Sequence, residues 1–171
     1  MDIFSHSLYG GAAFGRKNRK SFWTAFFIGM SPDLLSFGVF WTTGILGLHQ
    51  IPVFHNGHPD PAMFPSYLQS LYNVTHSLFV FLAVFLIVWL IRRKPFWELG
   101  AWGLHIIVDI PSHSYQFFPT PFLWPFSNFK VSSISWSDPR IFIPNVIILI
   151  IIYSFWFWRW KINKKEKRYE K

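Results

Sequence analysis

Three histidines and two aspartates have the types and spacing to hold a metal ion. His105 and Asp109 are four residues apart, so on a helix they project from one face and could bind one ion together. His6, Asp33 and His76 lie in other parts of the chain. Neutral imidazole and carboxylate suit zinc, manganese or iron, with zinc the default. Asp33 or Asp109 could also act catalytically by accepting a proton from water.

The chain contains no cysteine, which excludes disulfides, zinc–thiolate sites and a cysteine nucleophile. Any metal must therefore be held by His, Asp or Glu. His113 continues the four-residue step from Asp109, but Pro111 lies between them. His113 is thus a further candidate metal ligand, which either reaches the site from the following loop or is solvated. Three more histidines stand among Pro and Gly and are interpreted as solvated loop residues: His49, His55 and His58.

The composition indicates what must position these side chains. Of 171 residues, 51% are apolar and only 14% are charged, against roughly 25% charged in ordinary soluble domains. The apolar residues form long uncharged runs, which argues against a disordered chain and against a soluble globule. The fold predicted is all-α, an integral membrane bundle of about four to five membrane-embedded helices.

Three runs are long enough to cross a bilayer, which takes about 20 mainly apolar residues. They cover residues 21–48, with a kink or break expected at Pro32, residues 72–91, and residues 141–158. Residues 2–15 and 95–110 are shorter, and we expect them to be helices packed inside the bundle. Small residues such as Gly10 and Gly11 would let neighbouring helices approach closely.

Basic residues mark the ends of the apolar runs. The net charge is +8, and 14 of the 16 Lys and Arg fall within residues 16–20, 92–94 and 159–171. Such clusters indicate membrane topology rather than nucleic-acid binding. The positive-inside rule places all three in the cytoplasm of a multi-pass protein. Residues 1–160 are then one membrane-embedded helical domain, and residues 161–171 are a basic cytoplasmic tail.

This topology places the five ionisable residues at one depth. They lie 10 to 16 residues from the nearest basic cluster, which at about 1.5 Å per helical residue is roughly 15 to 24 Å above the inner face. Ionisable groups inside a membrane cost a few kcal/mol or more, so they usually face a protected interior where they have partners. Glu98, close to Lys94, is shallower and is not expected in the site. For any one residue, helix-bridging hydrogen bonds are the simpler interpretation; for the set, a metal site is predicted.

The motifs also resemble a known family. His6 before a Gly/Ala helix, the sequence Ser31-Pro32-Asp33-Leu34, Thr75-His76-Ser77, and His105 with Asp109 occur in the order found in an inner-membrane family of metal-dependent hydrolases that has a LexA-regulated member. The resemblance covers roughly residues 3–130. That family is similar in motif to zinc-dependent phospholipase C.

The resemblance implies a zinc site that hydrolyses phospholipid. In it, His6, His76, His105 and Asp109 would be metal ligands, Asp33 a ligand or the base that orients water, and His113 a further ligand. Many relatives have His-Arg-Gly before Thr-His-Ser, whereas this chain has Leu71-Tyr72-Asn73-Val74. This departure favours a single-metal site, or one that holds no catalytic metal.

The sequence therefore predicts a metal-dependent hydrolase of the inner (cytoplasmic) membrane, acting on phospholipid or another phosphoester. Membrane lipid would be both solvent and substrate, no nucleic acid would bind, and nothing indicates a protein partner. The alternative is a non-catalytic membrane protein whose His/Asp layer binds metal or protons for transport, or holds the helices together. A basic tail that binds a partner ranks behind both, because such tails more often anchor topology and attract anionic lipid.

Overall fold

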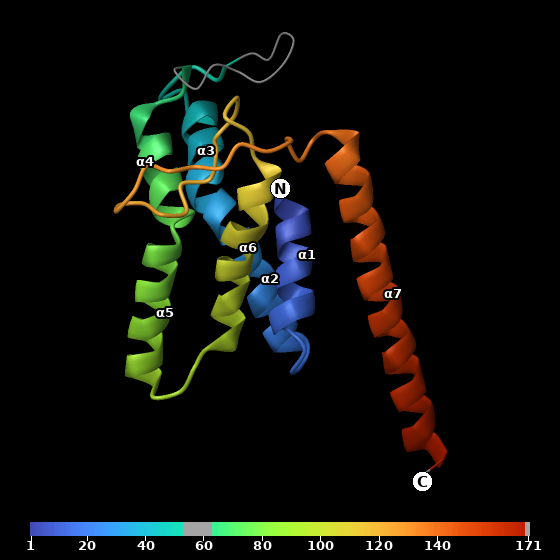
Figure 1. Ribbon diagram of the computed structural model, residues 1–171. Helices are drawn as coiled ribbons and strands as arrows, with labels where there is room; N and C mark the ends of the chain where they lie inside the picture. Colours follow the sequence, from blue (N-terminus) through green and yellow to red (C-terminus); the bar gives the residue numbers. More distant parts are fainter. Residues whose placement is uncertain (53–62, 170–171) are drawn as a thin grey trace.

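The computed structural model describes residues 1–52 and 63–169, and their regular structure is helical apart from one isolated bridge between Ser114 and Phe117. The helices are α1 (Ile3–Phe14), α2 (Arg19–Asp33), α3 (Val39–Ile45), α4 (Ser66–Thr75), α5 (Leu78–Arg92), α6 (Gly100–Asp109) and α7 (Pro139–Tyr169). They form an upright bundle with α1, α2 and α6 at its centre (Figure 1). The predicted all-α class is confirmed.

Side-chain caps define where several helices begin. Asp2 accepts from the Ser5 amide at the start of α1, and Asn18 accepts from the Ser21 amide at the start of α2. Each bond satisfies an amide that has no partner inside the helix. The short turn between Phe14 and Arg19 makes α1 and α2 run antiparallel, which returns the chain to the level of His6.

The span predicted over residues 21–48 forms without a break. Pro32 lies inside α2, and a π-helical turn, Leu34–Gly38, joins α2 directly to α3. Pro32 has no amide hydrogen to donate, and a local π-helical turn lets the helix continue past the disturbance. The continuous helix from Arg19 to Ile45 has a mean hydropathy of 1.2 and is long enough to cross a membrane.

The span predicted over residues 72–91 is not one straight helix. It is divided into α4 and α5, whose axes are bent by 56° at His76 and Ser77. The Ser77 hydroxyl caps α5 by accepting from the Val80 amide. The cap starts a new helix at this point, and the break leaves His76 at the junction.

Helix α7 contains the predicted span 141–158 and continues through the predicted tail as far as Tyr169. Its segment Pro139–Arg159 has a mean hydropathy of 2.2. Within the described residues, two helices are therefore long and apolar enough to cross a membrane, or three if α4 and α5 form one span. Helix α5 buries none of its side chains in the protein. An apolar helix without protein cover fits a lipid environment, so the structure indicates a membrane protein.

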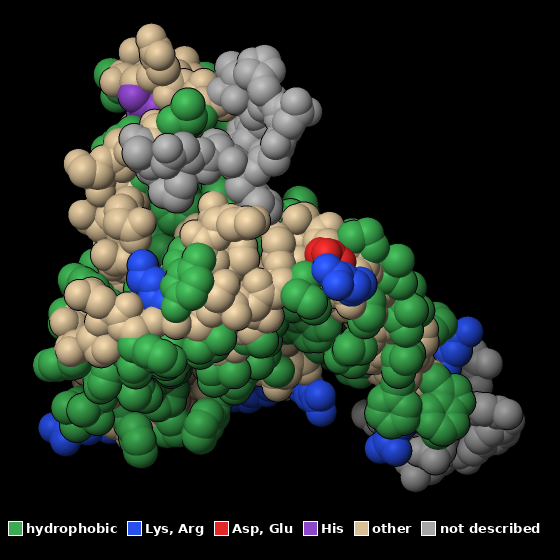
Figure 2. Space-filling view, turned by 45° about the horizontal axis from the view of Figure 1, so that its top comes forward, with side chains coloured by type: hydrophobic (Ala, Val, Ile, Leu, Met, Phe, Trp, Pro, Cys, Tyr) green, Lys and Arg blue, Asp and Glu red, His purple; other side chains and the backbone are tan. Residues whose placement is uncertain are grey.

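The three basic clusters lie at one end of the bundle. The α1–α2 turn, the α5–α6 turn and the C-terminal end of α7 all lie at the bottom of Figure 1. Figure 2 shows Lys and Arg side chains along the lower edge of the molecule, below a broad apolar surface. This arrangement is the one that the positive-inside rule requires of a multi-pass chain.

The central helices pack unusually close because glycines face one another. A Cβ on Gly10 would lie 2.8 Å from the Ala25 carbonyl oxygen, and a Cβ on Gly29 would lie 2.7 Å from the His6 carbonyl oxygen. Only glycine leaves room for such backbone contact. The predicted close approach is confirmed, and it brings the His6 backbone directly against α2.

Candidate metal centre

Six ionisable side chains from five segments meet in the interior of the bundle. They are His6 from α1, Asp33 from the end of α2, His76 from the α4–α5 break, His105 and Asp109 from α6, and His113 from the segment after α6. All except Asp33 are buried, and Asp33 is 16% exposed.

Asp109 is the centre of the cluster. Its Oδ1 lies 2.8 Å from His6 Nε2 and 3.3 Å from His113 Nε2. Its Oδ2 lies 3.3 Å from His105 Nε2 and 3.5 Å from His76 Nε2. One carboxylate therefore faces four imidazoles, each through the Nε2 atom.

Asp33 supplies a second carboxylate on the open side. Its Oδ1 lies 3.5 Å from His76 Nε2 and 3.8 Å from His105 Nε2. The potential ligand atoms form two overlapping triads, each within 4.8 Å: His6 with His105 and Asp109, and Asp33 with His76 and His105. His105 belongs to both triads, which makes the cluster one site.

Backbone carbonyls hold two of the imidazoles by their opposite nitrogen. His105 Nδ1 lies 2.7 Å from the Gly29 carbonyl oxygen, and His76 Nδ1 lies 3.2 Å from the Tyr72 carbonyl oxygen. Because a carbonyl oxygen only accepts, we assign the hydrogen to Nδ1 in both rings. The Thr75 hydroxyl, which donates to the Leu71 carbonyl oxygen, lies 2.9 Å from His76 Nδ1 and accepts from it in this assignment. In a neutral ring, Nε2 then presents a lone pair to the cluster. Metal-binding histidines are commonly oriented by this kind of bond.

His113 is oriented in the same way. Its Nδ1 donates to the Phe118 carbonyl oxygen over 2.9 Å, and its Nε2 points toward Asp109. The Met1 amino group also contacts Asp109 Oδ1 and lies 3.0 Å from His113 Nε2.

The imidazoles of His76 and His105 lie so close together that a positive charge between or on them would be stabilising. His76 Nε2 and His105 Nε2 lie 3.1 Å apart. With both Nδ1 atoms used as donors, two neutral rings would direct two lone pairs at each other, beside two carboxylates. Either a proton on one ring or a metal ion removes the repulsion.

Buried polar atoms without partners indicate the same need. His6 Nε2 and Asp109 Oδ2 are buried and have no hydrogen-bond partner among the described residues, even though His6 Nε2 is close to the other carboxylate oxygen. The rings of His6 and His105 are stacked with centroids 3.6 Å apart. Buried polar groups are nearly always paired, so the donor set fits a cation that these atoms would ligate.

The five ionisable residues that the sequence singled out lie together in one cluster, and His113 joins them. A 3₁₀ turn, Ile110–Ser112, carries the chain past Pro111 so that His113 stays within reach of Asp109. Glu98 lies away from the cluster, where it accepts from the Ser21 hydroxyl. His49 packs on Phe40, away from the cluster. His55 and His58 lie outside the described residues.

The sequence analysis missed the contribution of Tyr72. Its ring stacks on His76 with centroids 3.9 Å apart, its carbonyl oxygen accepts from the same imidazole, and its hydroxyl donates to the Phe118 carbonyl oxygen. Tyr72 precedes His76 by four residues, a spacing that places both on one helix face. That spacing was the available signal, within the stretch where the chain departs from the family motif.

An apolar hollow of about 520 Å³ reaches the cluster from one side. Asp33 and His113 line it together with Phe4, Leu34, Phe37 and Trp41. Phe4, Leu34 and Trp41 are also exposed on the outer surface of the bundle. The hollow therefore opens at the exposed apolar surface of α1, the π-helical turn and α3, and reaches Asp33, the more accessible carboxylate of the site.

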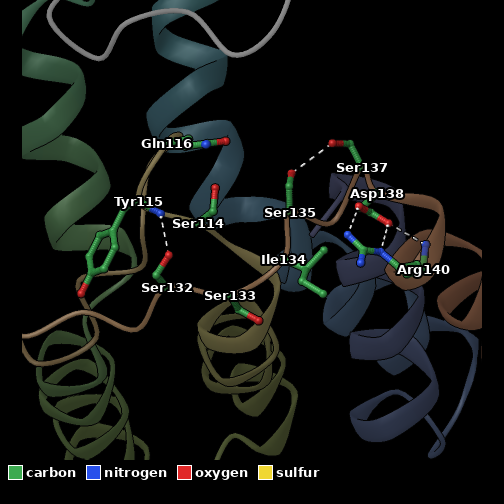
Figure 3. A pocket seen from close by; sticks show the side chains of 10 residues that line it. All are labelled: Ser114, Tyr115, Gln116, Ser132, Ser133, Ile134, Ser135, Ser137, Asp138 and Arg140. Atoms are coloured by element: carbon green, nitrogen blue, oxygen red, sulfur yellow. Dashed lines mark hydrogen bonds and ion pairs between the residues drawn. The ribbon is translucent and has the colours of Figure 1, made fainter.

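A second, polar hollow of about 590 Å³ lies on the segment that follows His113. Serine hydroxyls, Tyr115 and Gln116 surround it, and an Asp138–Arg140 ion pair closes one side (Figure 3). The Ser133 amide donates to the His113 carbonyl oxygen, so this segment is tied to the cluster. None of the six clustered side chains lines this hollow.

Comparisons with protein-family models, with curated proteins and with solved structures find no match to this chain. The structure itself shows a buried His/Asp cluster among apolar helices.

Proposed function

We propose that this chain is a membrane-bound metal-dependent hydrolase of the family that its motifs resemble. The observation that carries the proposal is the 3.1 Å separation of His76 Nε2 and His105 Nε2, with each ring already donating from Nδ1. The two overlapping triads of imidazole and carboxylate atoms form a donor set that zinc accepts readily, and that manganese and iron also accept.

The six clustered residues divide into ligands and a base. His6, His76, His105, His113 and Asp109 are buried and would hold the ion, whereas Asp33 is the more exposed carboxylate and faces the apolar hollow. A bound zinc ion supplies Lewis acidity, which lowers the pKa of water toward about 7 and neutralises charge on a phosphoryl oxygen. Asp33 would accept the proton of the attacking water, with Asp109 as the alternative base.

The apolar hollow favours a lipid substrate, either phospholipid or another phosphoester with an apolar part. An acyl chain would lie along Phe4, Leu34 and Trp41 and remain continuous with the hydrocarbon of the bilayer, while the ester would reach Asp33. Lys130 and Arg140 are the only cations between residues 95 and 158, and Arg140 is paired with Asp138. The metal would therefore have to provide most of the phosphate recognition.

The same topology gives the proposed location. All three basic clusters lie at one end of the bundle, so the positive-inside rule places that end, with the C-terminus, in the cytoplasm. The His/Asp cluster then lies toward the side of the membrane that faces away from the cytosol. We assign the protein to the inner (cytoplasmic) membrane as a multi-pass protein.

Metal analysis of the purified protein tests the proposal. We expect a stoichiometric divalent metal, with zinc first, in the wild type and its loss in His76→Ala and Asp109→Ala. His49→Ala is the matched control, because His49 stacks on Phe40 away from the cluster. A wild-type protein without metal, or full metal content in both site variants, would refute the metal centre.

Turnover separates hydrolysis from binding alone. We expect phospholipid or phosphodiester hydrolysis by the wild type, and a loss of about 10²-fold or more in Asp33→Asn, the size typical of a general base. The Asp33→Asn protein should keep its metal, because Asp109 and the histidines remain. Stoichiometric metal without turnover would instead identify the non-catalytic alternative, in which the layer serves transport or holds the helices.

A further inference from the structure

We propose that a second site, separate from the His/Asp cluster, binds an anionic phospholipid between the α1–α2 turn and α7. A hollow of about 580 Å³ lies there, at the end of the bundle that carries the basic clusters. Arg16 and Arg19 line it together with three aromatic residues, Phe22 from α2 and Tyr153 and Trp156 from α7. The hollow thus combines two cationic groups with an aromatic wall.

The two arginines are available to an anion. Arg16 uses its Nε to donate to the Ala12 carbonyl oxygen over 2.6 Å, which fixes the side chain at the end of α1. In the part of the chain that the structure describes, neither Arg16 nor Arg19 forms an ion pair with a carboxylate. Both side chains are exposed. Guanidinium groups bind phosphate through two parallel hydrogen bonds, so the pair is complementary to a phosphate group.

The aromatic rings of Phe22, Tyr153 and Trp156 make the rest of the hollow apolar. The rings of Phe22 and Trp156 lie 5.6 Å apart between centroids. The Tyr153 hydroxyl already donates to the Leu8 carbonyl oxygen over 2.8 Å, so its ring is the part that remains for the hollow. Free inorganic phosphate would leave this wall in contact with water. A phospholipid fits both the arginines and the aromatic rings, because its phosphate binds the arginines while its acyl chains cover the rings.

The packing of α7 explains why a lipid has room there. Helix α7 is attached to α1 by hydrogen bonds from Asn145 to Ser5 and from Tyr9 to Asn145, near its beginning, and by Tyr153 further along. Toward the C-terminus it leans away from α1 in the view of Figure 1. An acyl chain would fill the space that opens between the two helices. Basic pockets between membrane helices on this side are typical sites for anionic headgroups.

Native mass spectrometry of the purified full chain tests this site. The protein is equilibrated with equal amounts of dioleoyl-phosphatidylglycerol and dioleoyl-phosphatidylcholine, and the retained lipids are counted. We expect phosphatidylglycerol to be retained in preference to phosphatidylcholine. The variant Arg16→Gln/Arg19→Gln should lower that preference by roughly tenfold or more, as expected for two basic groups at an anionic surface. Lys17 and Lys20 remain in this variant to hold the topology.

A matched variant and a matched ligand make the outcome decisive. Arg93→Gln/Lys94→Gln removes two exposed charges from the same end of the bundle, outside the hollow, and should leave the preference unchanged. Trp156→Ala should weaken retention without altering these charges. Equal loss in the two charge variants, or no preference in the wild type, would overturn the proposal. Displacement of the lipid by an equal concentration of glycerol phosphate would show a simple phosphate site instead. None of these readings depends on metal or hydrolysis.

Discussion

His76 and His105 face each other through their Nε2 atoms at 3.1 Å, while each ring donates from Nδ1 to a backbone carbonyl oxygen. The two carbonyls belong to different helices, at Tyr72 on α4 and Gly29 on α2. The backbone of the bundle therefore sets the direction of both rings before any ligand is present.

Removal of the metal should lower the thermal stability of the wild type. A ligand that binds only the folded state stabilises it by about 4 kcal/mol at a thousand times its dissociation constant, and here the ion would also relieve the repulsion among the Nε2 lone pairs. We expect a chelator to lower the Tm, measured by tryptophan fluorescence, and added zinc to restore it. Asp109→Ala should show neither response. A wild-type Tm that does not change with chelator would contradict a structural contribution of the ion.

Gly29 should be among the least replaceable residues of the bundle. A Cβ at this position would lie 2.7 Å from the His6 carbonyl oxygen, and backbone cannot move aside as a flexible side chain can. We expect Gly29→Ala to destabilise the protein by about 1 to 3 kcal/mol, as overpacking does, and to lower metal content because His105 donates to the Gly29 carbonyl.

Gly38→Ala is the control for that substitution. It lies on the same continuous helix, but its Cβ would meet only the Leu34 side chain, at 3.4 Å or more. Unfolding in a denaturant series should therefore show little change or a small gain. Equal destabilisation in the two variants would mean that the close contact between Gly29 and the His6 backbone does not determine the result.

The sequence was sufficient to identify the candidate site because ionisable residues are conspicuous in apolar runs. His6, Asp33 and Asp109 stand nearly alone among Gly, Ala and apolar residues, and the cost of burying them predicts that they meet. The position of His113 was not decidable in the same way. Pro111 favours the end of a helix, and whether the chain then turns toward the site or away from it depends on a 3₁₀ turn that Pro111 itself permits.

The bend at His76 could not be predicted from hydropathy. Apart from Asn73 and the Thr75-His76-Ser77 motif near its start, the run from Tyr72 to Ile91 is apolar and uncharged, so by hydropathy it is typical of one straight span. The break depends on a local competition, in which the Ser77 hydroxyl caps a new helix and donates to the Trp124 carbonyl oxygen. The second bond joins residues that are far apart in the chain, and such a contact is invisible to any local pattern.

Asp138, which lies just before α7 and outside the spans, gives a pH-dependent signal through its ion pair with Arg140. Hydrogen bonds from Arg140 lower the pKa of Asp138 from 3.8 to about 2. Because the pKa of the folded state is depressed, the stabilisation from this pair is present above about pH 4 and is lost as the pH falls toward 2. Arg140→Gln should raise the pKa of Asp138 toward 3.8, measured from its carboxyl carbon by NMR. The control Lys130→Gln should leave that pKa unchanged.

The topology can be tested directly because the chain has no cysteine. Ser137 is exposed at the end opposite the basic clusters, and Lys94 is exposed within one of them. Their side chains should therefore lie on opposite sides of the membrane. In intact cells, a membrane-impermeant maleimide should label Ser137→Cys and leave Lys94→Cys unlabelled until the cells are opened. The reverse pattern would place the basic clusters outside the cytoplasm and would contradict the proposed topology. Labelling of both residues in intact cells would show that they do not lie on opposite sides, and the proposed spans would then have to be redrawn.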